Sequence, residues 1–254
     1  TLVLVINFKL GIKGVFLATV FGTLLGMLTA IYFCRNYFSK VISLTLLLPI
    51  FVYALPQMPG VFINWIQNQT GRIFINYYLT LSDQGLYAIA FMIATVMIMV
   101  TTAFRMSYDP YALSIMKKKN AKEIYSKFYS GYAFIFGILL AFISNFAKPV
   151  LIILTPYEYH SAYLIVTWLL GGAFLMGANN ILGVGIWITK KTKYTSYAQL
   201  VTFITVIIFS FLLVPYFGAI GAAISFFIGS IAQSVAYYLF AQKLYRINYQ
   251  YLRV

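Results

Sequence analysis

The sequence predicts an all-α, polytopic bundle of about seven membrane-spanning helices, and three observations carry this fold class. First, 62% of the 254 residues are hydrophobic and only 9% are charged, with a mean hydropathy of +0.88. Soluble domains are close to half apolar and a quarter charged, so a water-soluble enzyme and a disordered chain are both excluded. Second, the apolar residues form runs close to the roughly 20 residues that cross about 30 Å of hydrocarbon. Third, basic residues gather between alternate runs, as in membrane proteins of fixed orientation.

The apolar runs, taken in order, give the predicted spans. A partial span ends near Phe8, and the full spans cover residues 14–34, 43–66, 86–104, 129–153, 162–188, 197–214 and 219–241. The run at 86–104 has no charged residue and is the clearest. Runs much longer than about 20 residues imply tilted or kinked helices rather than extra spans. Because the chain opens inside an apolar run without an initiator methionine, we expect it to begin within a helix of a longer protein.

Lysine and arginine set the predicted orientation. If each run crosses the membrane once, 14 of them fall on one side and 4 on the other. The larger set is Arg35, Lys40, Arg105, Lys117, Lys118, Lys119, Lys122, Lys127, Lys190, Lys191, Lys193, Lys243, Arg246 and Arg253, and the smaller set is Lys9, Lys13, Arg72 and Lys148. The positive-inside rule therefore predicts a cytoplasmic C-terminus. The lysines at 117–127 fit a solvated helix face equally well, and anionic membrane lipids are a further expected contact.

The scarcity of reactive side chains argues against catalysis and metal binding. The chain has one cysteine, one histidine and four scattered acids, so neither a disulfide framework nor a cluster of metal ligands is expected. We predict no catalytic residue, no metal and no cofactor. Topology explains the net charge of +14, and nucleic acid is not an expected partner. No carboxylate lies deep in a predicted span, so the sequence shows no ion coupling.

An internal repeat indicates two related halves. With an offset of 207 residues, 10–14 (LGIKG) align with 217–221 (FGAIG). Small residues at such spacings are common in packed membrane helices, so chance convergence is the alternative. If the repeat is real, residues 1–42 form the end of an N-terminal helix bundle with a cytoplasmic linker, and residues 43–254 form a C-terminal six-helix bundle.

A polar helical face is predicted after the prolines at 49, 56 and 59, which kink or interrupt the helix because proline lacks a backbone donor. If the next segment is helical, its polar residues recur every four positions and drift slowly around one face. These residues are Asn64, Asn68, Arg72 and Asn76. A charge near the bilayer centre costs at least about 2.5 kcal/mol, so this face is predicted to line a hydrated, substrate-binding cavity. The alternative is a loop that emerges into water.

Three further residues are candidates for binding substrate in that cavity. Asn179 and Asn180 lie in the glycine-rich run 162–188, where asparagine either hydrogen-bonds between helices or lines a cavity. Arg105 lies at the end of its run. It serves either as a topology anchor or as a cavity cation.

Two helix starts are predicted from capping residues. Asp109 followed by Pro110 has the character of an N-cap and a first helical residue, so a surface helix is expected to begin there and to run into the next span. Ser82 or Asp83 is expected to cap the span that starts near Leu86.

Several short segments resemble one family of membrane proteins. They are residues 71–75 (GRIFI), 81–87 (LSDQGLY), 103–104 (AF) and 110–114 (PYALS). Together with the span pattern, they resemble the second half of the bacterial polysaccharide repeat-unit flippases, which belong to the multidrug/oligosaccharidyl-lipid/polysaccharide exporter superfamily. The resemblance covers the whole chain, from the sixth to the twelfth helix of a pseudo-symmetric transporter with two bundles.

The resemblance implies a function and partners. Members of that family carry undecaprenyl-diphosphate-linked oligosaccharides from the cytoplasmic to the outer leaflet of the bacterial plasma membrane by alternating access. A central cationic cavity accepts the diphosphate and the sugar, while the lipid tail stays in the bilayer. Polysaccharide polymerases or transferases are further implied partners.

By the same likeness, Arg72 is the cavity-side arginine of the family. The aspartate that usually precedes this arginine is Gly71 here, which leaves the arginine without that ion pair. An unpaired arginine suits a diphosphate because its fork binds phosphate oxygens. Replacing Arg72 by alanine is therefore expected to abolish export without reducing the amount of protein.

Three other functions stay open. A drug or metabolite exporter of the same superfamily shares the fold and differs in its cavity. A membrane-embedded glycosyltransferase or acyltransferase requires a positioned acid, base or nucleophile, of which the chain has few. A scaffold that transports nothing requires no hydrated cavity.

Overall fold

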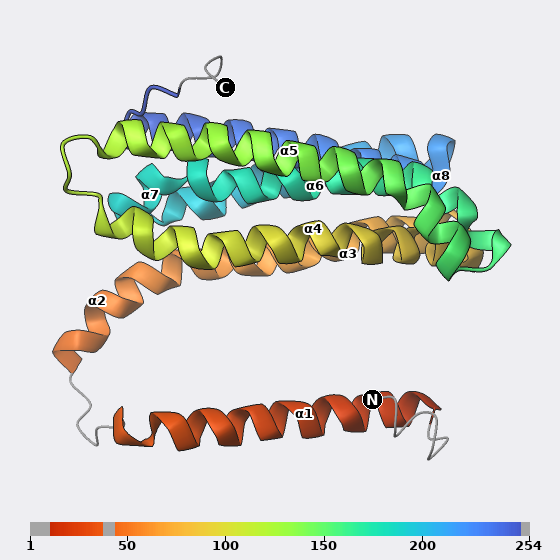
Figure 1. Cartoon of the computed structure of the whole chain (residues 1–254), viewed down its shortest axis with the longest axis horizontal. Coiled ribbons are helices and arrows are strands. Elements are labelled where there is room, and N and C mark those ends of the chain that lie inside the picture. Colours follow the sequence, from red (N-terminus) through yellow and green to blue (C-terminus); the bar gives the residue numbers. More distant parts are fainter. Residues whose placement is uncertain (1–10, 38–43, 250–254) are drawn as a thin grey trace. The chain divides into compact units, whose positions relative to one another are not determined.

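The protein is helical throughout the residues described by the computed structural model, 11–37 and 44–249 (Figure 1). Helices make up 91% of the structure, and the described residues contain no strand. Six helices are long and apolar enough to cross a membrane, so the predicted all-α, polytopic membrane class is confirmed. The elements are α1 (Gly11–Cys34), η2 (Arg35–Tyr37), α2 (Leu44–Ala54), η3 (Leu55–Gln57), α3 (Met58–Tyr78), α4 (Leu81–Ser114), α5 (Ala121–Leu154), η4 (Tyr157–Ala162), α6 (Tyr163–Leu182), α7 (Val184–Ile188) and α8 (Lys193–Leu244).

The chain divides into two compact units, Thr1–Leu48 and Pro49–Val254. The first unit contains α1, whose candidate span Lys13–Cys34 agrees with the predicted span 14–34. The partial span predicted to end near Phe8 lies outside the described residues, as does the predicted domain boundary between residues 42 and 43. That boundary and the relation between two homologous halves stay predictions.

The proline-rich stretch interrupts the helix without ending the span. Pro49 lies inside α2, and a short 3₁₀ segment then connects α2 to α3. A candidate span continues across these breaks from Leu47 to Tyr78. It extends beyond the predicted end at residue 66 because α3 is one helix to Tyr78, and the alternative of a loop in water is wrong.

Both predicted helix starts on α4 are wrong, for local reasons. The N-cap is Thr80, whose hydroxyl accepts from the Asp83 backbone N–H while the Asp83 carboxylate accepts from the Thr80 backbone N–H. This reciprocal capping box outcompetes a cap at Ser82 or at Asp83 itself. No helix begins at Asp109, because α4 continues through Pro110 to Ser114. Pro110 lies near the end of α4, where the loss of one backbone hydrogen bond is tolerated. The helix ends at Ser114, and residues 115–120 connect it to α5.

The 52 residues of α8 form two antiparallel segments joined at Gly218. This glycine has φ +60° and ψ −141°, a conformation that residues with a side chain rarely adopt. The segments pack closely, because the ring of Tyr194 near the start of α8 lies 5.3 Å from the ring of Phe240 near its end. The two segments match the predicted spans 197–214 and 219–241.

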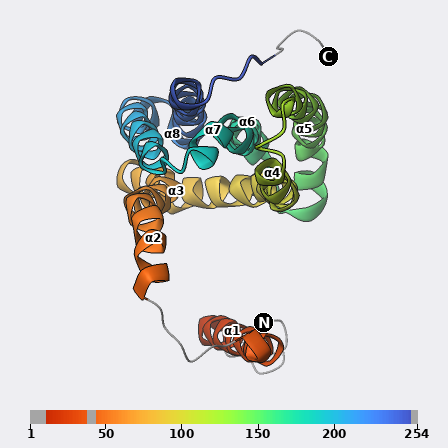
Figure 2. The ribbon, with the colours of Figure 1, turned by 90° about the vertical axis from the view of Figure 1, so that its left-hand side faces the viewer.

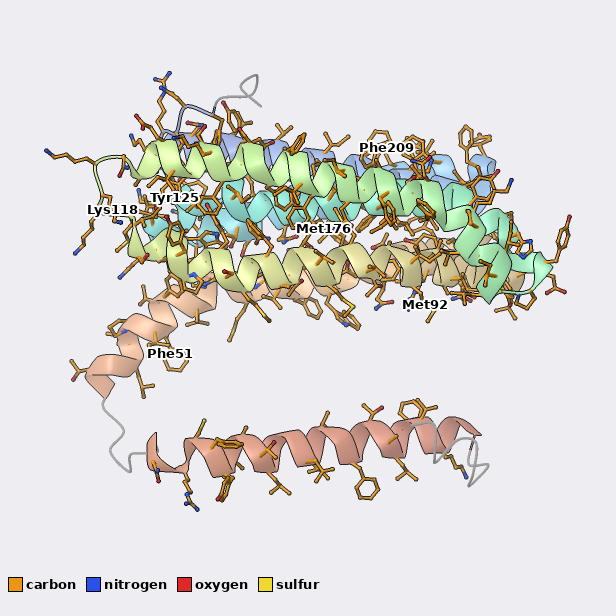
Figure 3. The ribbon with its side chains drawn as sticks, viewed as in Figure 1. Phe51, Met92, Lys118, Tyr125, Met176 and Phe209 are labelled. Atoms are coloured by element: carbon orange, nitrogen blue, oxygen red, sulfur yellow. The ribbon has the colours of Figure 1, made fainter. Side chains whose placement is uncertain are left out.

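Within the second unit, α6 forms the centre of the bundle. It packs against α4, α5 and α8, and the end-on view shows it between α8 and α5 (Figure 2). Its glycines permit this close approach, since a Cβ on Gly171 would lie 2.8 Å from the ring of Phe227. The outward-facing side chains are mainly apolar, as Met92 on α4 illustrates (Figure 3). An apolar exterior around a tightly packed centre is what a lipid environment requires.

Candidate binding cavity

A cavity of about 900 Å³ lies inside the second unit, between α3, α4, α6 and α8. Tyr53 of α2, Gln57 of η3 and two residues of α7 complete its wall. Met176, on the wall contributed by α6, lies between α4 and α6 in Figure 3. The polar and charged residues that line it are Gln57, Asn64, Asn68, Thr101, Thr102, Arg105, Asp109, Asn179, Asn180, Lys190, Thr195, Gln199 and Gln233. Its aromatic residues are Tyr53, Phe91, Tyr108, Trp187 and Tyr237. A polar lining of this kind inside an apolar bundle indicates a space that holds water or a polar ligand.

The formal charge of the cavity lining is positive. Arg105 and Lys190 supply two cations, and Asp109 supplies one acid. The Nε of Arg105 donates to the carboxylate of Asp109 over 3.2 Å, one helical turn further along α4. The two side chains are 57% and 46% exposed, so the cavity reaches the molecular surface at this point. Only Nε hydrogen-bonds to Asp109, so the two terminal nitrogens of the guanidinium make no hydrogen bond to a carboxylate among the described residues.

Three amides form a chain of hydrogen bonds from α3 to α8. The Nδ2 of Asn68 donates to Asn64 over 3.2 Å, and the Nδ2 of Asn64 donates to the amide oxygen of Gln199 over 3.4 Å. The same two helices are joined by the hydroxyl of Ser196, which donates to the backbone carbonyl of Pro56. This side of the cavity is therefore built from polar groups that already have partners.

Other residues of the cavity wall have polar groups without a partner. The hydroxyl of Tyr108, the whole side-chain amide of Asn179 and the Oε1 of Gln233 are buried without a hydrogen-bond partner among the described residues. The three residues are 3%, 5% and 2% exposed, and each lines the cavity. Leaving a buried polar group unpaired costs about 1–3 kcal/mol, so this wall is unfavourable unless a ligand or solvent completes it.

The structure brings five of the seven predicted site residues to this cavity: Asn64, Asn68, Arg105, Asn179 and Asn180. Arg72 and Asn76 are not among the lining residues. The guanidinium carbon of Arg72 lies 5.6 Å above the ring of Phe91, and Asn76 is exposed. A four-residue spacing advances about 40° around a helix at each step, so the face that begins at Asn64 has turned away by about 120° at Asn76.

Individual lining residues also have structural partners. The Nδ2 of Asn180 donates to the backbone carbonyl of Gly177 over 3.2 Å, within α6. Gly71 packs directly against Tyr87: a Cβ at this position would lie 2.6 Å from the hydroxyl oxygen of Tyr87, so a side chain here requires the tyrosine to shift.

Sequence reasoning missed Tyr108, Gln199 and Gln233. A usable signal existed for Gln233, because it is a lone amide in the apolar run 219–241. Gln199 lies near the start of its run and resembles an interfacial residue. Tyr108 is one of 22 tyrosines, and nothing in its neighbours distinguishes it.

Comparison with protein-family models, with curated proteins and with solved structures gives no match. The resemblance to polysaccharide flippases therefore stays a prediction from the sequence. Among the described residues, no three histidine, cysteine, aspartate or glutamate side chains come together as a possible metal site.

Proposed function

We propose that this chain is part of a transporter that flips undecaprenyl-diphosphate-linked oligosaccharides across the bacterial plasma membrane for cell-surface polysaccharide synthesis. The observation that carries the proposal is the cavity of about 900 Å³, polar and of positive formal charge, inside a bundle whose exterior is apolar. Ligand cavities commonly have volumes of about 300–1,000 Å³, so this one is large enough for a polar headgroup of several rings.

The charges of the cavity suit a diphosphate. Arginine binds phosphate oxygens through a planar fork of donors, and the terminal nitrogens of Arg105 make no hydrogen bond to a described carboxylate. Lys190 adds a second cation in the lining. The aromatic residues supply flat apolar surfaces, which complement sugar rings. The lipid tail would stay outside, against the apolar exterior of the bundle.

The location of the cavity fits uptake from the cytoplasmic leaflet. It lies at the end of the unit where α4 leads to α5 and where α7 leads to α8 (Figure 1). The basic residues that predict the cytoplasmic side are at the same end, with Lys118 extending away from the bundle (Figure 3). On the predicted orientation, the cavity therefore faces the leaflet in which lipid-linked oligosaccharides are completed. Polymerases or transferases of the same glycan are the proposed partners at the membrane.

The proposed function is tested by locating the lipid-linked glycan in a host from which the gene has been deleted. Completed repeat units should accumulate in the cytoplasmic leaflet, as measured by accessibility of the glycan to an impermeant enzyme added to oriented vesicles. Re-expression of the wild-type protein should restore outer-leaflet units. Incomplete units would instead indicate a transferase. Completed units in the outer leaflet of the deletion strain would refute the flippase and favour an exporter of other compounds.

A further inference from the structure

The unpartnered polar residues of the cavity lining come from three helices. Tyr108 belongs to α4, Asn179 to α6 and Gln233 to the second segment of α8. All three are more than nine-tenths buried, and each has at least one polar atom without a hydrogen-bond partner. Native proteins satisfy the large majority of buried polar atoms, so three exceptions in the lining of one cavity require an explanation.

These groups differ chemically from the cations in the same cavity. None of the three carries a formal charge, and together they offer both donors and acceptors. Each amide presents a carbonyl oxygen, whichever way its two ends are assigned, and that oxygen needs a donor in the ligand. A phosphate at neutral pH offers mainly acceptor oxygens, so it leaves the amide oxygens of Asn179 and Gln233 unsatisfied. A hydroxyl group both donates and accepts, so a ligand that carries several hydroxyl groups can satisfy each of the three residues.

We propose that Tyr108, Asn179 and Gln233 form a neutral hydrogen-bonding subsite that selects ligands by their uncharged hydroxyl or amide groups. It differs in chemistry from the cations Arg105 and Lys190 of the same lining, and it sets specificity for the headgroup beyond its charge. The inference rests on the proposed function only in requiring that the cavity binds a ligand.

The chain contains its own control for such a role. Gln67 on α3 is 1% exposed, and both polar atoms of its amide lack a partner among the described residues. It is not among the residues that line the cavity. Substituting methionine for Gln67 or for Gln233 removes a similarly buried amide that has at least one unpartnered atom. Only the second change removes a group from the cavity.

The experiment measures binding to the purified chain in lipid nanodiscs through the fluorescence of Trp187, which lines the cavity. Trp65 and Trp168 are first replaced by phenylalanine, which leaves one tryptophan. The two probes are hexyl maltoside and hexyl phosphate, which share a tail and differ in having a neutral, hydroxyl-rich or an anionic headgroup. We expect Y108F, N179L and Q233M each to weaken maltoside binding up to about tenfold, with phosphate binding unchanged. The melting temperature should stay the same or rise, because each variant removes an unpaired buried polar group.

The control Q67M should change the melting temperature in the same direction and leave both affinities unchanged. If N179L does not fold, Y108F and Q233M decide the question, since each keeps most of the original volume. Unchanged maltoside binding in Y108F and Q233M, or equal weakening of both probes, overturns the subsite. Wild-type protein that binds hexyl phosphate but not hexyl maltoside overturns the subsite and leaves the proposed function standing. Wild-type protein that binds neither probe contradicts both.

Discussion

The same long helices run between the two ends of the Pro49–Val254 unit (Figure 1), and different side chains meet at each end. At one end, amides, two cations and an acid surround a cavity of about 900 Å³. At the other end, aromatic rings lie directly on glycines of neighbouring elements. A Cβ on Gly71 would lie 2.6 Å from the hydroxyl oxygen of Tyr87, and one on Gly85 would lie 3.2 Å from the ring of Tyr159.

Glycine–aromatic contacts also occur beside the cavity, where a Cβ on Gly183 would lie 2.9 Å from the ring of Tyr237. The two ends therefore differ in their polar side chains, which teaches how one bundle can pack closely at one end, here called the closed end, and hold a cavity at the other. Where glycine faces an aromatic ring, the helices approach closely and dispersion contacts fill the space. Where long polar side chains face each other, neither lipid nor close packing satisfies them, and the helices stay apart around a cavity. An alternating-access transporter requires this asymmetry, and it requires that the asymmetry can be reversed. The predictions that follow test each end separately.

The largest effect is expected at the cavity end, on replacing Arg105. A hydrogen bond to a charged group contributes about 1.5–3 kcal/mol, so R105A should weaken binding of hexyl phosphate roughly tenfold to a hundredfold. The change in melting temperature should be small, because exposed ion pairs such as Arg105–Asp109 stabilise by less than about 1 kcal/mol. R105K should retain part of the affinity. The matched variant R72A should bind almost normally, since Arg72 does not line the cavity. A larger loss in R72A than in R105A would restore Arg72 as the principal cation.

The next largest effect is expected at the closed end, on replacing Gly71. A methyl group there collides with Tyr87, and overpacking of this kind costs about 1–3 kcal/mol, so G71A should lower the melting temperature. The additional change Y87F should restore part of the loss, because the nearest atom is the hydroxyl oxygen. The control is G137A on α5, where a Cβ meets no atom within 4 Å. That variant should gain up to about 1 kcal/mol from helix propensity. Equal stability of G71A and G137A would mean that glycine does not close this end.

The smallest effect is expected for the amide chain between α3 and α8. Interhelical hydrogen bonds in membranes average about 0.6 kcal/mol, so N64L should lower stability only slightly. The double variant N64L/Q199L removes both partners of one bond and should be no less stable than N64L. Neither variant should alter binding of hexyl phosphate. A substantial loss of binding in N64L would assign these amides to the ligand rather than to the packing of two helices.

Much of the fold was predictable because hydrophobic runs of membrane length have few alternative structures. Periodicity placed α3 as a helix with a polar face, and it located the two segments of α8. The helix ends were less predictable, since Thr80 and Asp83 satisfy each other in a way that neither residue indicates alone. Pro110 shows the same difficulty. Its sequence context suggests the start of a helix, but proline is also tolerated close to the end of one, as here in α4.

The cavity was predictable in kind and only partly in membership. Asparagine and arginine in apolar runs predict polar interior space, and five of the seven predicted residues line the cavity. Arg72 was predicted to lie with Asn64, but helical drift over eight residues and the ring of Phe91 place it elsewhere. Tyr108 and Gln233 depend on which face of α4 meets α6 and α8, and this rotation is decided by packing between segments far apart in sequence.

The turn at Gly218 also decides how many times the chain crosses the membrane. A straight helix of the length of α8 would measure about 78 Å, more than twice the thickness of the hydrocarbon layer. Because the chain reverses at Gly218, α8 crosses the membrane twice with helices of ordinary length instead of once with a helix that is too long. Two crossings return the chain to the side of the membrane on which α8 began. Lys193 and Lys243 then share one side, as their charges favour. With almost no polar loop between the two segments, we expect them to enter the bilayer together as a preformed pair. The backbone angles of one residue without a side chain thus determine the side of the membrane on which everything after α8 lies.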